Sequence, residues 1–444
     1  MRPLDRNRTA GYNDAKNQKF LWAVQPMNSI IRKLTNEEMP LFADIAINAY
    51  PGVTQNTPEF KEKFTKNLIQ IQESEETIDF FGLFRDGKLL GGMRIHYFKM
   101  NLFSKIIDAG GIGQVAVDLL HKKEKVAKEL VGYFIAYFKE KGVSLVMLYP
   151  FRPDFYKKMG FGYGTKMNQY HAELASFPNE VSREGLVFLD ASHKDEIRDC
   201  YNQYAESVHG MIIKTGYDMD VMFKNPDHKL VGFFENGKLK GYLLFAFKKM
   251  SERNFLTTNI VIKEMIYESP ESLLKLCAFL HSQQDQIQRV TLQTQDDSLE
   301  YLLGDPRNGS NNIIPSVYHE ILSAGVGIMY RIINAEKFFS QMEGFDFNSQ
   351  TATFKLTIED SFMLKGQQTF TVKLVNGQLR LSDSETADFE AELNVADLSS
   401  LLIGAADVQK LYNYGKLKIS SKDHAHTLHK IFINHEKPIC MSAF

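Results

Sequence analysis

A cluster of basic residues lies where an expected strand gives way to an expected helix. The stretch VAVDLLHKKEKVAKELV, residues 115–131, carries His121, Lys122, Lys123 and Lys125 in its turn. Such a junction gathers unpaired backbone N–H groups and the positive end of a helix dipole, a combination that binds phosphate. The turn contains no glycine, which usually lets a backbone approach a phosphate closely. The residues alone therefore leave open whether this turn holds a phosphate.

A tyrosine with a glycine-rich run behind it is the second candidate for chemistry. The short apolar segment SLVMLYPF, residues 144–151, predicts a buried strand, and FYKKMGFGYG follows it. Tyr156 thus comes just after the strand end, where the ligand crevice of an open sheet lies. A phenol there can donate a proton, although a lone tyrosine in such a place is more often a packing residue. Tyr163 is the alternative within the same segment, and we interpret it as a packing residue.

The elements that position these residues can be predicted from periodicity and turn signals. A strand over 30–34 precedes a capping box of Thr35 with Glu38 and an apolar-periodic helix, and a second helix is expected over 58–73. Two strands, IDFFGLFRD and LLGGMRIHYFKM, are joined by Asp86-Gly87, a dipeptide suited to a tight hairpin. Together with the basic turn, its helix and the buried strand, these segments form one α/β unit.

That unit is repeated. The segment GLFRDGKLLG, residues 82–91, recurs as GFFENGKLKG at 232–241, and the order of helix and strand signals around it also recurs. The second strand-to-helix junction reads YESPES, which is acidic and lacks lysines. We therefore expect a duplicated unit whose second copy binds no cofactor.

The sequence pattern changes again near residue 336, after the two repeated units. Alternating strands TATFKLTIED, QTFTVKLVNG and QLRLSDS precede helix-like segments, which predicts a separate small α+β domain. The expected division is an N-terminal extension over 1–26, a first unit over 27–168, a second unit over 169–335 and a third domain over 336–444. The extension contains Trp22, and we assign it no function.

Composition excludes several classes of protein. With 52 basic and 54 acidic residues the net charge is −2, which offers no overall field for nucleic acid or an anionic membrane. The three cysteines, Cys200, Cys277 and Cys440, are widely separated and match neither a disulfide framework nor a zinc spacing. No apolar run reaches the roughly 18 residues of a membrane span, and the first 26 residues are too polar for a secretory signal. A cytoplasmic protein is expected.

The order of these features resembles a known family. Strand, basic turn, helix, strand and then an aromatic-Tyr-x-x-Met-Gly-Phe segment is similar to the acetyl-CoA half of the GNAT acetyltransferase fold. In the third domain, LLIGAADVQKLYNYGKLKIS is similar to the helix-glycine-strand ending of sterol carrier domains. From Met27 to Phe444 the chain resembles the enhanced-intracellular-survival (Eis) type of bacterial N-acetyltransferase. The resemblance implies a mixed α/β and α+β fold with two tandem GNAT units, the second degenerate, and a sterol-carrier-like domain.

The resemblance also implies where acetyl-CoA binds. The backbone of Val115, Ala116 and Val117 would hold the pantetheine arm, and the following loop would hold the pyrophosphate. In the family this loop has a basic residue, two further residues, a glycine and a small or apolar pair. Here those positions are filled by Lys122, Lys123, Glu124, Lys125, Val126 and Ala127, so that Lys125 stands where the glycine is expected.

Two proton-transfer groups follow from the same resemblance. Tyr156 matches the tyrosine that acts as general acid for the departing thiolate, and the C-terminal carboxylate of an aromatic residue, here Phe444, acts as base. A free α-carboxyl, with a pKa of about 3.5, would need burial to serve as a base near neutral pH. His96 and Phe98 are expected on the acceptor side as candidate pocket residues, with sheet packing as their alternative role. Ala443 replaces an acidic residue of some relatives that recognises polycationic substrates.

The expected function is transfer of an acetyl group from acetyl-CoA to a primary amine of an aminoglycoside, a polyamine or a lysine side chain. Direct attack on the thioester needs no metal. Relatives form trimers paired into hexamers, so a homo-oligomer is expected. The alternative is a non-catalytic lipid-binding or scaffold protein in which the glycine-free turn has lost acetyl-CoA.

Overall fold

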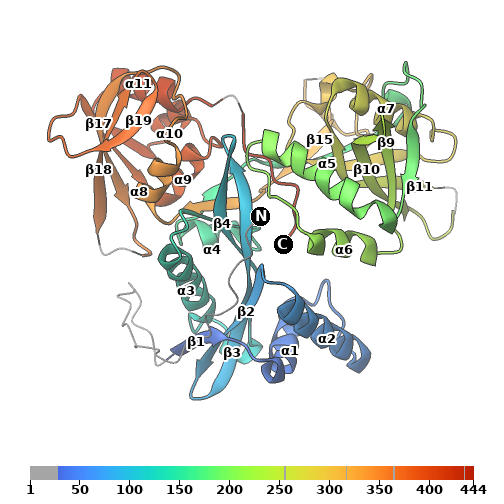
Figure 1. Ribbon diagram of the computed structural model, residues 1–444, viewed down its shortest axis with the longest axis horizontal. Coiled ribbons are helices and arrows are strands. Elements are labelled where there is room, and N and C mark those ends of the chain that lie inside the picture. The colour runs from blue at the N-terminus through green and yellow to red at the C-terminus, as the bar shows by residue number, and fades with distance from the viewer. Residues whose placement is uncertain (1–28, 255–256, 317, 364–365, 435) are drawn as a thin grey trace, which may run out of the picture.

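Three bodies of the chain meet around its C-terminus (Figure 1). The computed structural model describes residues 29–444 apart from 255–256, 317, 364–365 and 435. The first unit, blue to teal in Figure 1, lies below; the second, green to yellow, lies to the right; and the third domain, orange to red, lies to the upper left. The predicted extension over 1–26, with Trp22, falls outside the described residues.

The first unit contains the elements predicted from its periodicity, together with two short elements over 153–157 and 162–163 that were not predicted. They are β1 (Ser29–Lys33), α1 (Met39–Ala49), α2 (Pro58–Ser74), β2 (Ile78–Arg85), β3 (Lys88–Leu102), β4 (Lys105–Val117), α3 (Val126–Glu140), β5 (Leu145–Leu148), α4 (Pro153–Lys157) and β6 (Gly162–Tyr163). The predicted capping box is confirmed, because the N–H of Thr35 donates to Oε2 of Glu38 at 3.0 Å. The predicted hairpin is confirmed too: Asp86 and Gly87 adopt φ of 50° and 77°, as a two-residue turn between twisted strands requires.

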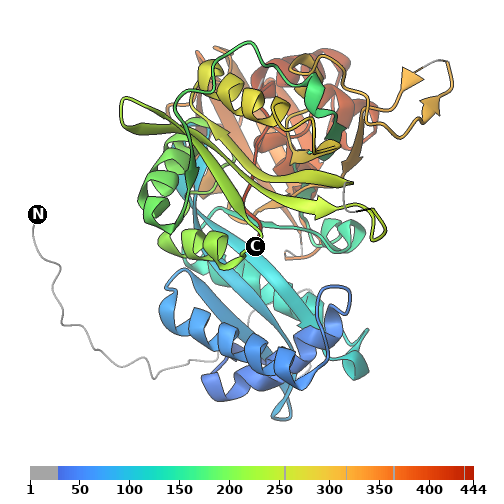
Figure 2. The same cartoon turned by 90° about the vertical axis from the view of Figure 1, so that its right-hand side faces the viewer.

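Helices cover both faces of the first sheet. α1 and α2 pack on one face through residues that include Phe42, Ile71 and Phe80, whereas α3 packs on the other through Leu130 and Phe134. Both faces are apolar, which explains why β2 is buried along almost its whole length. The sheet is thereby fixed between two helical layers, and the C-terminus lies beside it (Figure 2).

One strand of the first sheet comes from much later in the chain. The sheet order is β1-β2-β3-β4-β5-β16-β6, and β16 (Met329–Ile332) pairs antiparallel with both β5 and β6. The preceding strand, β15 (Leu322–Gly325), pairs instead with β7 (Met167–Ala172) in the second sheet. In space, therefore, the last strand before residue 335 belongs to the first sheet.

The second unit repeats the first. It contains β8 (Leu186–Leu189), α5 (Lys194–Ser207), α6 (Gly216–Lys224), β9 (Lys229–Glu235), β10 (Lys238–Lys249), β11 (Thr258–Tyr267), α7 (Pro270–His281) and β12 (Arg289–Thr294), in the sheet order β15-β7-β12-β11-β10-β9-β8. The predicted repeat is confirmed by the register, because Gly91 faces Val117 and, 150 residues later, Gly241 faces Tyr267. The short β13 (Ile313–Ile314) and β14 (Tyr318–His319) form a separate hairpin.

The third domain is an α+β body packed on the first sheet. Its elements are α8 (Ala335–Gln341), β17 (Ala352–Glu359), β18 (Gln367–Val375), β19 (Gln378–Ser382), β20 (Phe389–Asn394), α9 (Val395–Leu402), α10 (Val408–Asn413), β21 (Leu417–Ile419) and α11 (Lys422–Phe432). The strand order is β19-β18-β17-β20-β21. Every residue of α9 is buried, because this helix lies between its own sheet and the strands β16 and β6.

Two expectations about surface and redox chemistry can be checked directly. Cys200, Cys277 and Cys440 are all buried and free, in agreement with a sequence that offers no disulfide framework. Among the described residues, no helix combines the length and the apolar character that crossing a membrane would require.

Candidate active site

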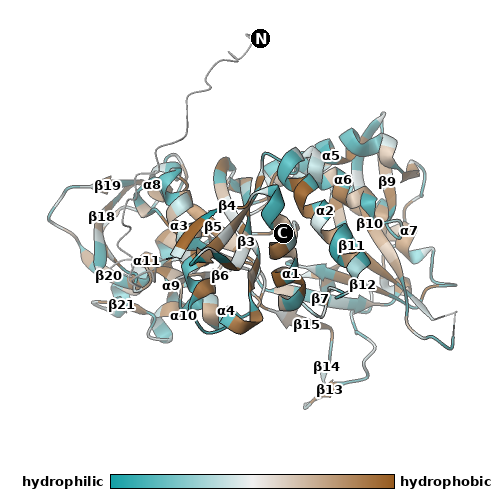
Figure 3. Cartoon of the chain, turned by 90° about the horizontal axis from the view of Figure 1, so that it is seen from below, coloured by the Kyte–Doolittle hydropathy of each residue, from teal (hydrophilic) through white to brown (hydrophobic). Residues whose placement is uncertain are grey.

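A cavity of about 550 Å³ opens between the first sheet and the helices α1 and α2. The largely hydrophobic helix α1 lies beside the C-terminus (Figure 3), and Ala46 of α1 lines the cavity together with Phe444. The lining comes from six parts of the chain: Ala46, Tyr50, Val53, Thr54, Phe60, Phe64, Arg94, Ile112, Gly113, Gln114, Val115, Tyr149, Pro150, Phe151, Tyr156 and Phe444. Three residues predicted for catalysis or cofactor binding, Val115, Tyr156 and Phe444, are therefore brought together in one place.

The cavity lies where two strands of the sheet separate. Parallel pairing of β4 with β5 runs from Ala109–Leu145 to Gly111–Met147, whereas β4 continues to Val117. Gln114 has φ of 50°, in the left-handed region, and marks a bulge in β4. The Tyr50 hydroxyl donates to the Val115 carbonyl at 2.8 Å and fixes the strand beyond this bulge. The sheet is thus open beside Val115.

Tyr156 lies on α4, directly after β5, with its side chain 7% exposed. Its hydroxyl has no hydrogen-bond partner among the described residues and belongs to the cavity lining. Burial raises the pKa of Tyr156, and the nearby Tyr50 phenol acts in the same direction. The phenol therefore stays protonated through the physiological range and can supply a proton to a group in the cavity.

The C-terminal residue is held in an aromatic seat. The Phe444 ring packs edge-on against Phe98 at a centroid distance of 4.9 Å and against His96 at 5.5 Å, and it lies tilted against Tyr149 at 5.4 Å. Burial beside Arg94 lowers the pKa of His96 well below its ordinary value, so that the imidazole is neutral. His96 and Phe98, which the sequence placed on the acceptor side, thus bind the Phe444 ring and do not line the cavity.

Two glycines of β4 make room for the terminal residue. A Cβ atom on Gly113 would lie 3.1 Å from the carboxyl carbon of Phe444 and 3.9 Å from Nη2 of Arg94. A Cβ atom on Gly111 would press on the ring of Phe98. A larger residue at either position would displace the aromatic side chains or the terminal carboxylate. Because Gly113 has no side chain, the Phe444 carboxylate and the Arg94 guanidinium both lie close to its backbone.

The chain that leads to Phe444 is fastened mainly by the second unit. The Ile439 N–H donates to the His209 carbonyl at 2.8 Å, and the Cys440 N–H donates to Oε1 of Gln295 at 2.5 Å. The Tyr149 hydroxyl of the first unit donates to the Cys440 carbonyl at 3.3 Å. The tail, red in Figure 2, thereby runs between the two sheets and ends at the cavity.

The basic turn keeps a left-handed backbone without glycine. Lys123 has φ of 70° and Lys125 has φ of 66°, a region that glycine occupies easily and other residues occupy at a cost. α3 begins at the next residue, Val126, so the first N–H groups of this helix open onto the turn. Lys122, Lys123 and Lys125 are exposed and form no salt bridge with any described residue. The turn can therefore offer both backbone donors and lysine charge to an anion.

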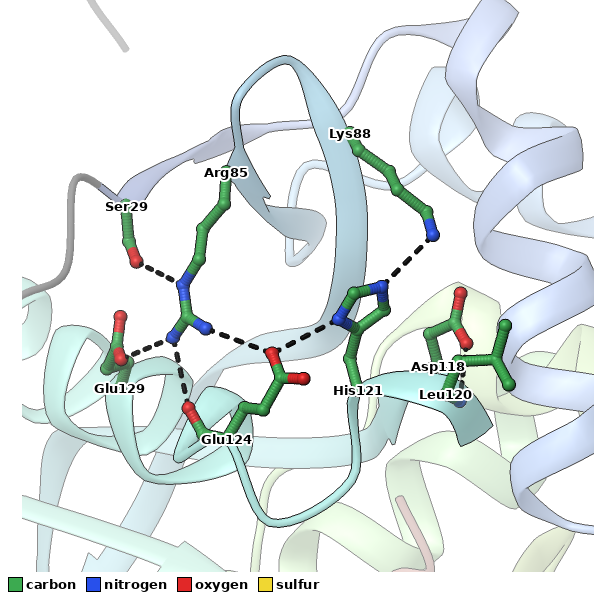
Figure 4. A network of polar contacts seen from close by, with 8 residues as sticks. All are labelled: Ser29, Arg85, Lys88, Asp118, Leu120, His121, Glu124 and Glu129. Carbon is green, nitrogen blue, oxygen red and sulfur yellow. Dashed lines mark hydrogen bonds and ion pairs between the residues drawn. The ribbon is translucent and has the colours of Figure 1, made fainter.

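A network of polar contacts joins this turn to the hairpin of β2 and β3 (Figure 4). The Arg85 guanidinium binds the Glu129 carboxylate at 2.7 Å and donates to the Glu124 carbonyl at 3.1 Å. The Glu124 carboxylate lies 3.4 Å from Arg85 and 3.1 Å from the His121 ring, which in turn contacts Lys88. The negative charge in the turn is thus already paired, which leaves its lysines positive.

The remaining predicted residues have clear positions. Ala116 and Val126 are buried in the core, under α1 and within α3, so only their backbones can contact a ligand. Val117 and Ala127 are partly buried at the two ends of the same segment. Tyr163 is 41% exposed on β6, lies under the Lys157 ammonium and is not part of the cavity lining.

The second unit differs at the corresponding places. α7 begins three residues after β11, whereas α3 begins nine residues after β4, so no comparable turn can form. At the repeat position of Gln114 stands Glu264, which forms a buried salt bridge with Lys214 and accepts from the Tyr242 hydroxyl. Side chains of the unit itself therefore fill this region.

Sequence reasoning missed several cavity residues, Arg94 foremost among them. An arginine inside the otherwise apolar strand segment LLGGMRIHYF was a visible signal, because such a charge needs a partner. Tyr50, Gln114 and Tyr149 gave no comparable signal, since aromatic and amide residues are common at strand and helix ends.

Family comparisons identify all three bodies. Residues 30–164 and residues 216–332 each match the acetyltransferase (GNAT) domain, and residues 335–441 match the sterol carrier protein domain. The search among curated proteins found no match to the chain.

Solved structures share the complete arrangement. A GCN5-related N-acetyltransferase from Anabaena variabilis matches with a TM-score of 0.77 and 17% identity, over 94% of this chain and 100% of the other. A probable N-acyltransferase from Enterococcus faecalis gives 0.74 and 20%, over 94% and 99%. Eis1 from Mycobacterium abscessus gives 0.72 and 17%, over 94% and 100%. At these sequence identities the structural likeness shows that the fold is shared.

Proposed function

Since the chain is a GNAT acetyltransferase with two GNAT domains and a sterol carrier domain, we propose that Tyr156 and the Phe444 carboxylate catalyse acetyl transfer to a primary amine. The amine attacks the thioester directly, Phe444 accepts its proton and Tyr156 donates one to the sulfur. The candidate acceptors are aminoglycosides, polyamines and lysine-like amines. The observation that carries this proposal is the convergence of Tyr156, Phe444 and Val115 on one cavity.

The first unit has groups that fit acetyl-CoA, which supplies an activated acyl group and a thiol leaving group. The opening between β4 and β5 offers backbone groups of residues 115–117, and Oε1 of Gln114 is buried there without a donor. The turn at 122–125 has left-handed backbone at Lys123 and Lys125 and unpaired lysines for the pyrophosphate. Lys122, Lys123 and Lys125, with the backbone of Val126 and Ala127, are the proposed phosphate site.

The two proton roles suit the surroundings of each group. Burial keeps the Tyr156 phenol protonated, so that a proton is available when the leaving sulfur develops charge. The Phe444 carboxylate lies over bare backbone at Gly113, with its ring fixed on three sides. A carboxylate held in place beside the reacting amine can remove a proton without first being oriented, and this lowers the entropic part of the barrier.

The other two domains are proposed to position these groups. Lys157, beside Tyr156, forms a salt bridge with Asp397 of α9, and the buried Arg331 binds both the Met159 carbonyl and Asp360. The buried packing of α9 supports such a structural role over a lipid carrier. Because the second unit lacks the basic turn, we expect one acetyl-CoA per chain.

The test is thiol release from acetyl-CoA with a panel of polyamines, aminoglycosides and lysine peptides. Tyr156→Phe should lower kcat by roughly 100-fold, the usual contribution of a general acid, with acetyl-CoA binding retained. The matched control is Tyr163→Phe, which changes an exposed phenol outside the cavity and should turn over normally. Turnover unchanged in Tyr156→Phe would remove the general-acid role, and absence of both turnover and acetyl-CoA binding would favour the scaffold function.

A further inference from the structure

Arg94 carries a positive charge that no group of the described chain neutralises. It lies on β3, in the cavity lining, and its Nε is buried without an acceptor. Its guanidinium forms no salt bridge with any described residue. An ion removed from water costs several kcal/mol unless it is paired and hydrogen-bonded, so an arrangement of this kind is expected where a ligand completes it.

The other buried lysine and arginine side chains of the described residues are paired. Arg331 binds the Asp360 carboxylate at 2.5 Å and the Met159 carbonyl, and Lys214 binds the Glu264 carboxylate. The repeat position of Arg94 in the second unit is Leu244, which faces Glu264 across the strands. The charge is thus specific to the unit that has the cavity, and a structural salt bridge does not explain it.

The Phe444 carboxylate lies near Arg94, yet the two form no salt bridge. Both lie close to the same point above Gly113, but no salt bridge joins them. The terminal carboxylate therefore remains available as a base, while the guanidinium keeps N–H groups for another acceptor. An attacking amine placed at Phe444 would have Arg94 within reach of its far substituents.

The other residues that line the cavity indicate the chemical character of the remainder of the ligand that Arg94 would bind. Phe60 and Phe64 of α2 stack on each other at 5.9 Å, and Phe151, 79% exposed, stands at the rim edge-on to Tyr50. Apart from the Phe444 terminus, the residues that line the cavity include no carboxylate. A second ammonium group would find no counter-ion here and would be repelled by Arg94.

We propose that the acceptor is a primary amine whose aromatic or apolar body carries an anionic group, and that Arg94 binds this group. This inference rests on the proposed function and narrows its substrate class, because it disfavours polyamines and aminoglycosides. A charge-assisted, two-pronged contact of guanidinium with carboxylate would orient the amine toward the Phe444 carboxylate.

Three benzylamines that differ only at the para position test the proposal. They are 4-(aminomethyl)benzoate, benzylamine and 1,4-bis(aminomethyl)benzene, with an anionic, a neutral and a cationic substituent. In the native enzyme kcat/KM for the benzoate should exceed that for benzylamine by at least about tenfold, and the diamine should be the poorest substrate. Arg94→Gln should reduce the preference to about twofold, whereas Arg94→Lys should retain part of it.

The possible outcomes distinguish failure of the Arg94 inference from failure of the proposed acetyl transfer. The control Arg380→Gln removes an exposed arginine of β19 and should keep the preference. Equal turnover of the three amines, or an equal loss for all three in Arg94→Gln, would overturn the acceptor role, while acetyl transfer to amines would stand. If the benzoate neither turned over nor bound, while a polyamine of the wider panel did, the inference would fail and the proposed function would survive. Without turnover of any amine, both would fail.

Discussion

The backbone N–H of Cys440 donates a hydrogen bond to Oε1 of Gln295, and this contact ties the C-terminal tail to the second unit. Gln295 directly follows β12, just as Tyr149 directly follows β5 in the first unit. The C-terminal tail therefore contacts the end of β12 in the second sheet and the corresponding end of β5 in the first sheet. A unit without a basic turn thus helps to place the terminal residue in the unit that has one.

Gln295→Leu should loosen this tail. The variant loses the acceptor for the Cys440 N–H and the amide contact with the Thr165 carbonyl at 3.3 Å. We expect kcat to fall by roughly tenfold or more, because small displacements of a catalytic group are costly. The acetyl-CoA Kd, measured by calorimetry, should not change. Gln295→Glu keeps the acceptor and should be less impaired, and equal kcat in all three proteins would contradict the role.

Changes at the last residue should affect turnover more than binding. Deletion of Phe444 removes the carboxylate from its seat, whereas a single glycine added after Phe444 keeps every side chain but moves the charge. We expect both to lower kcat/KM by about 100-fold or more, the range for loss of a general base. Phe444→Tyr keeps the carboxylate and an aromatic ring and is the control. Native turnover in either altered terminus would exclude the terminal carboxylate as the base.

Two substitutions of Lys125 should distinguish the effect of its backbone conformation on stability from the effect of its charge on acetyl-CoA binding. In Lys125→Gly the left-handed position is relieved of strain, which should raise the free energy of unfolding by about 1 kcal/mol. Lys125→Ala loses the same charge and keeps the strain. Both should weaken acetyl-CoA binding to a similar extent, roughly threefold for an exposed charge. Titration calorimetry and urea unfolding measure the two effects, and an unaltered Kd in both variants would mean that the lysine is remote from the phosphates.

Burial of the neutral His209 side chain should lower the free energy of unfolding at acidic pH. It lies between the three bodies: its Nδ1 accepts from the Phe103 N–H at 3.2 Å, and its Nε2 donates to the Ile403 carbonyl at 2.9 Å. Burial lowers the pKa of His209 to about 4. The unfolded chain takes up this proton below about pH 6.5, so stability is present above pH 6.5 and is lost as pH falls toward 4.

The loss attributable to His209 should be about 2 kcal/mol at pH 5 relative to pH 7. Urea unfolding of the native protein and of His209→Gln at both pH values measures it, with His319→Gln, an exposed histidine of β14, as the control. The glutamine variant should be less sensitive to pH. An identical pH dependence in the native protein and His209→Gln would contradict the assignment.

Much of the fold could be predicted because its signals are local. The Asp86-Gly87 hairpin, the Thr35 capping box and the period of α3 each depend on residues close together in sequence. β16 could not be predicted, since its four residues include Arg331 and are buried by elements from distant parts of the chain, among them β5, β6 and α9. The oligomer implied by the resemblance stays a prediction.

The site was predictable only in part for the same reason. Tyr156 and Phe444 could be named by resemblance, but the place of the Phe444 ring depends on His96 and Phe98, which the sequence assigned to the substrate. The lysine charge of the turn was visible, whereas the left-handed backbone of Lys125 was not. Arg94 was visible as a charge, but the cavity that leaves it unpaired is formed by five segments of the first unit and the terminus.

The position of β16 determines when the first unit can complete its sheet. Its sheet remains open between β5 and β6 until residues 329–332 have been synthesised, long after the ribosome has completed β5. Contacts between segments so distant in the chain form slowly and leave strand edges exposed in the meantime. A fragment ending near residue 168 would keep that edge permanently and would tend to aggregate, so the unit that carries Tyr156 depends for its own folding on the chain that follows it.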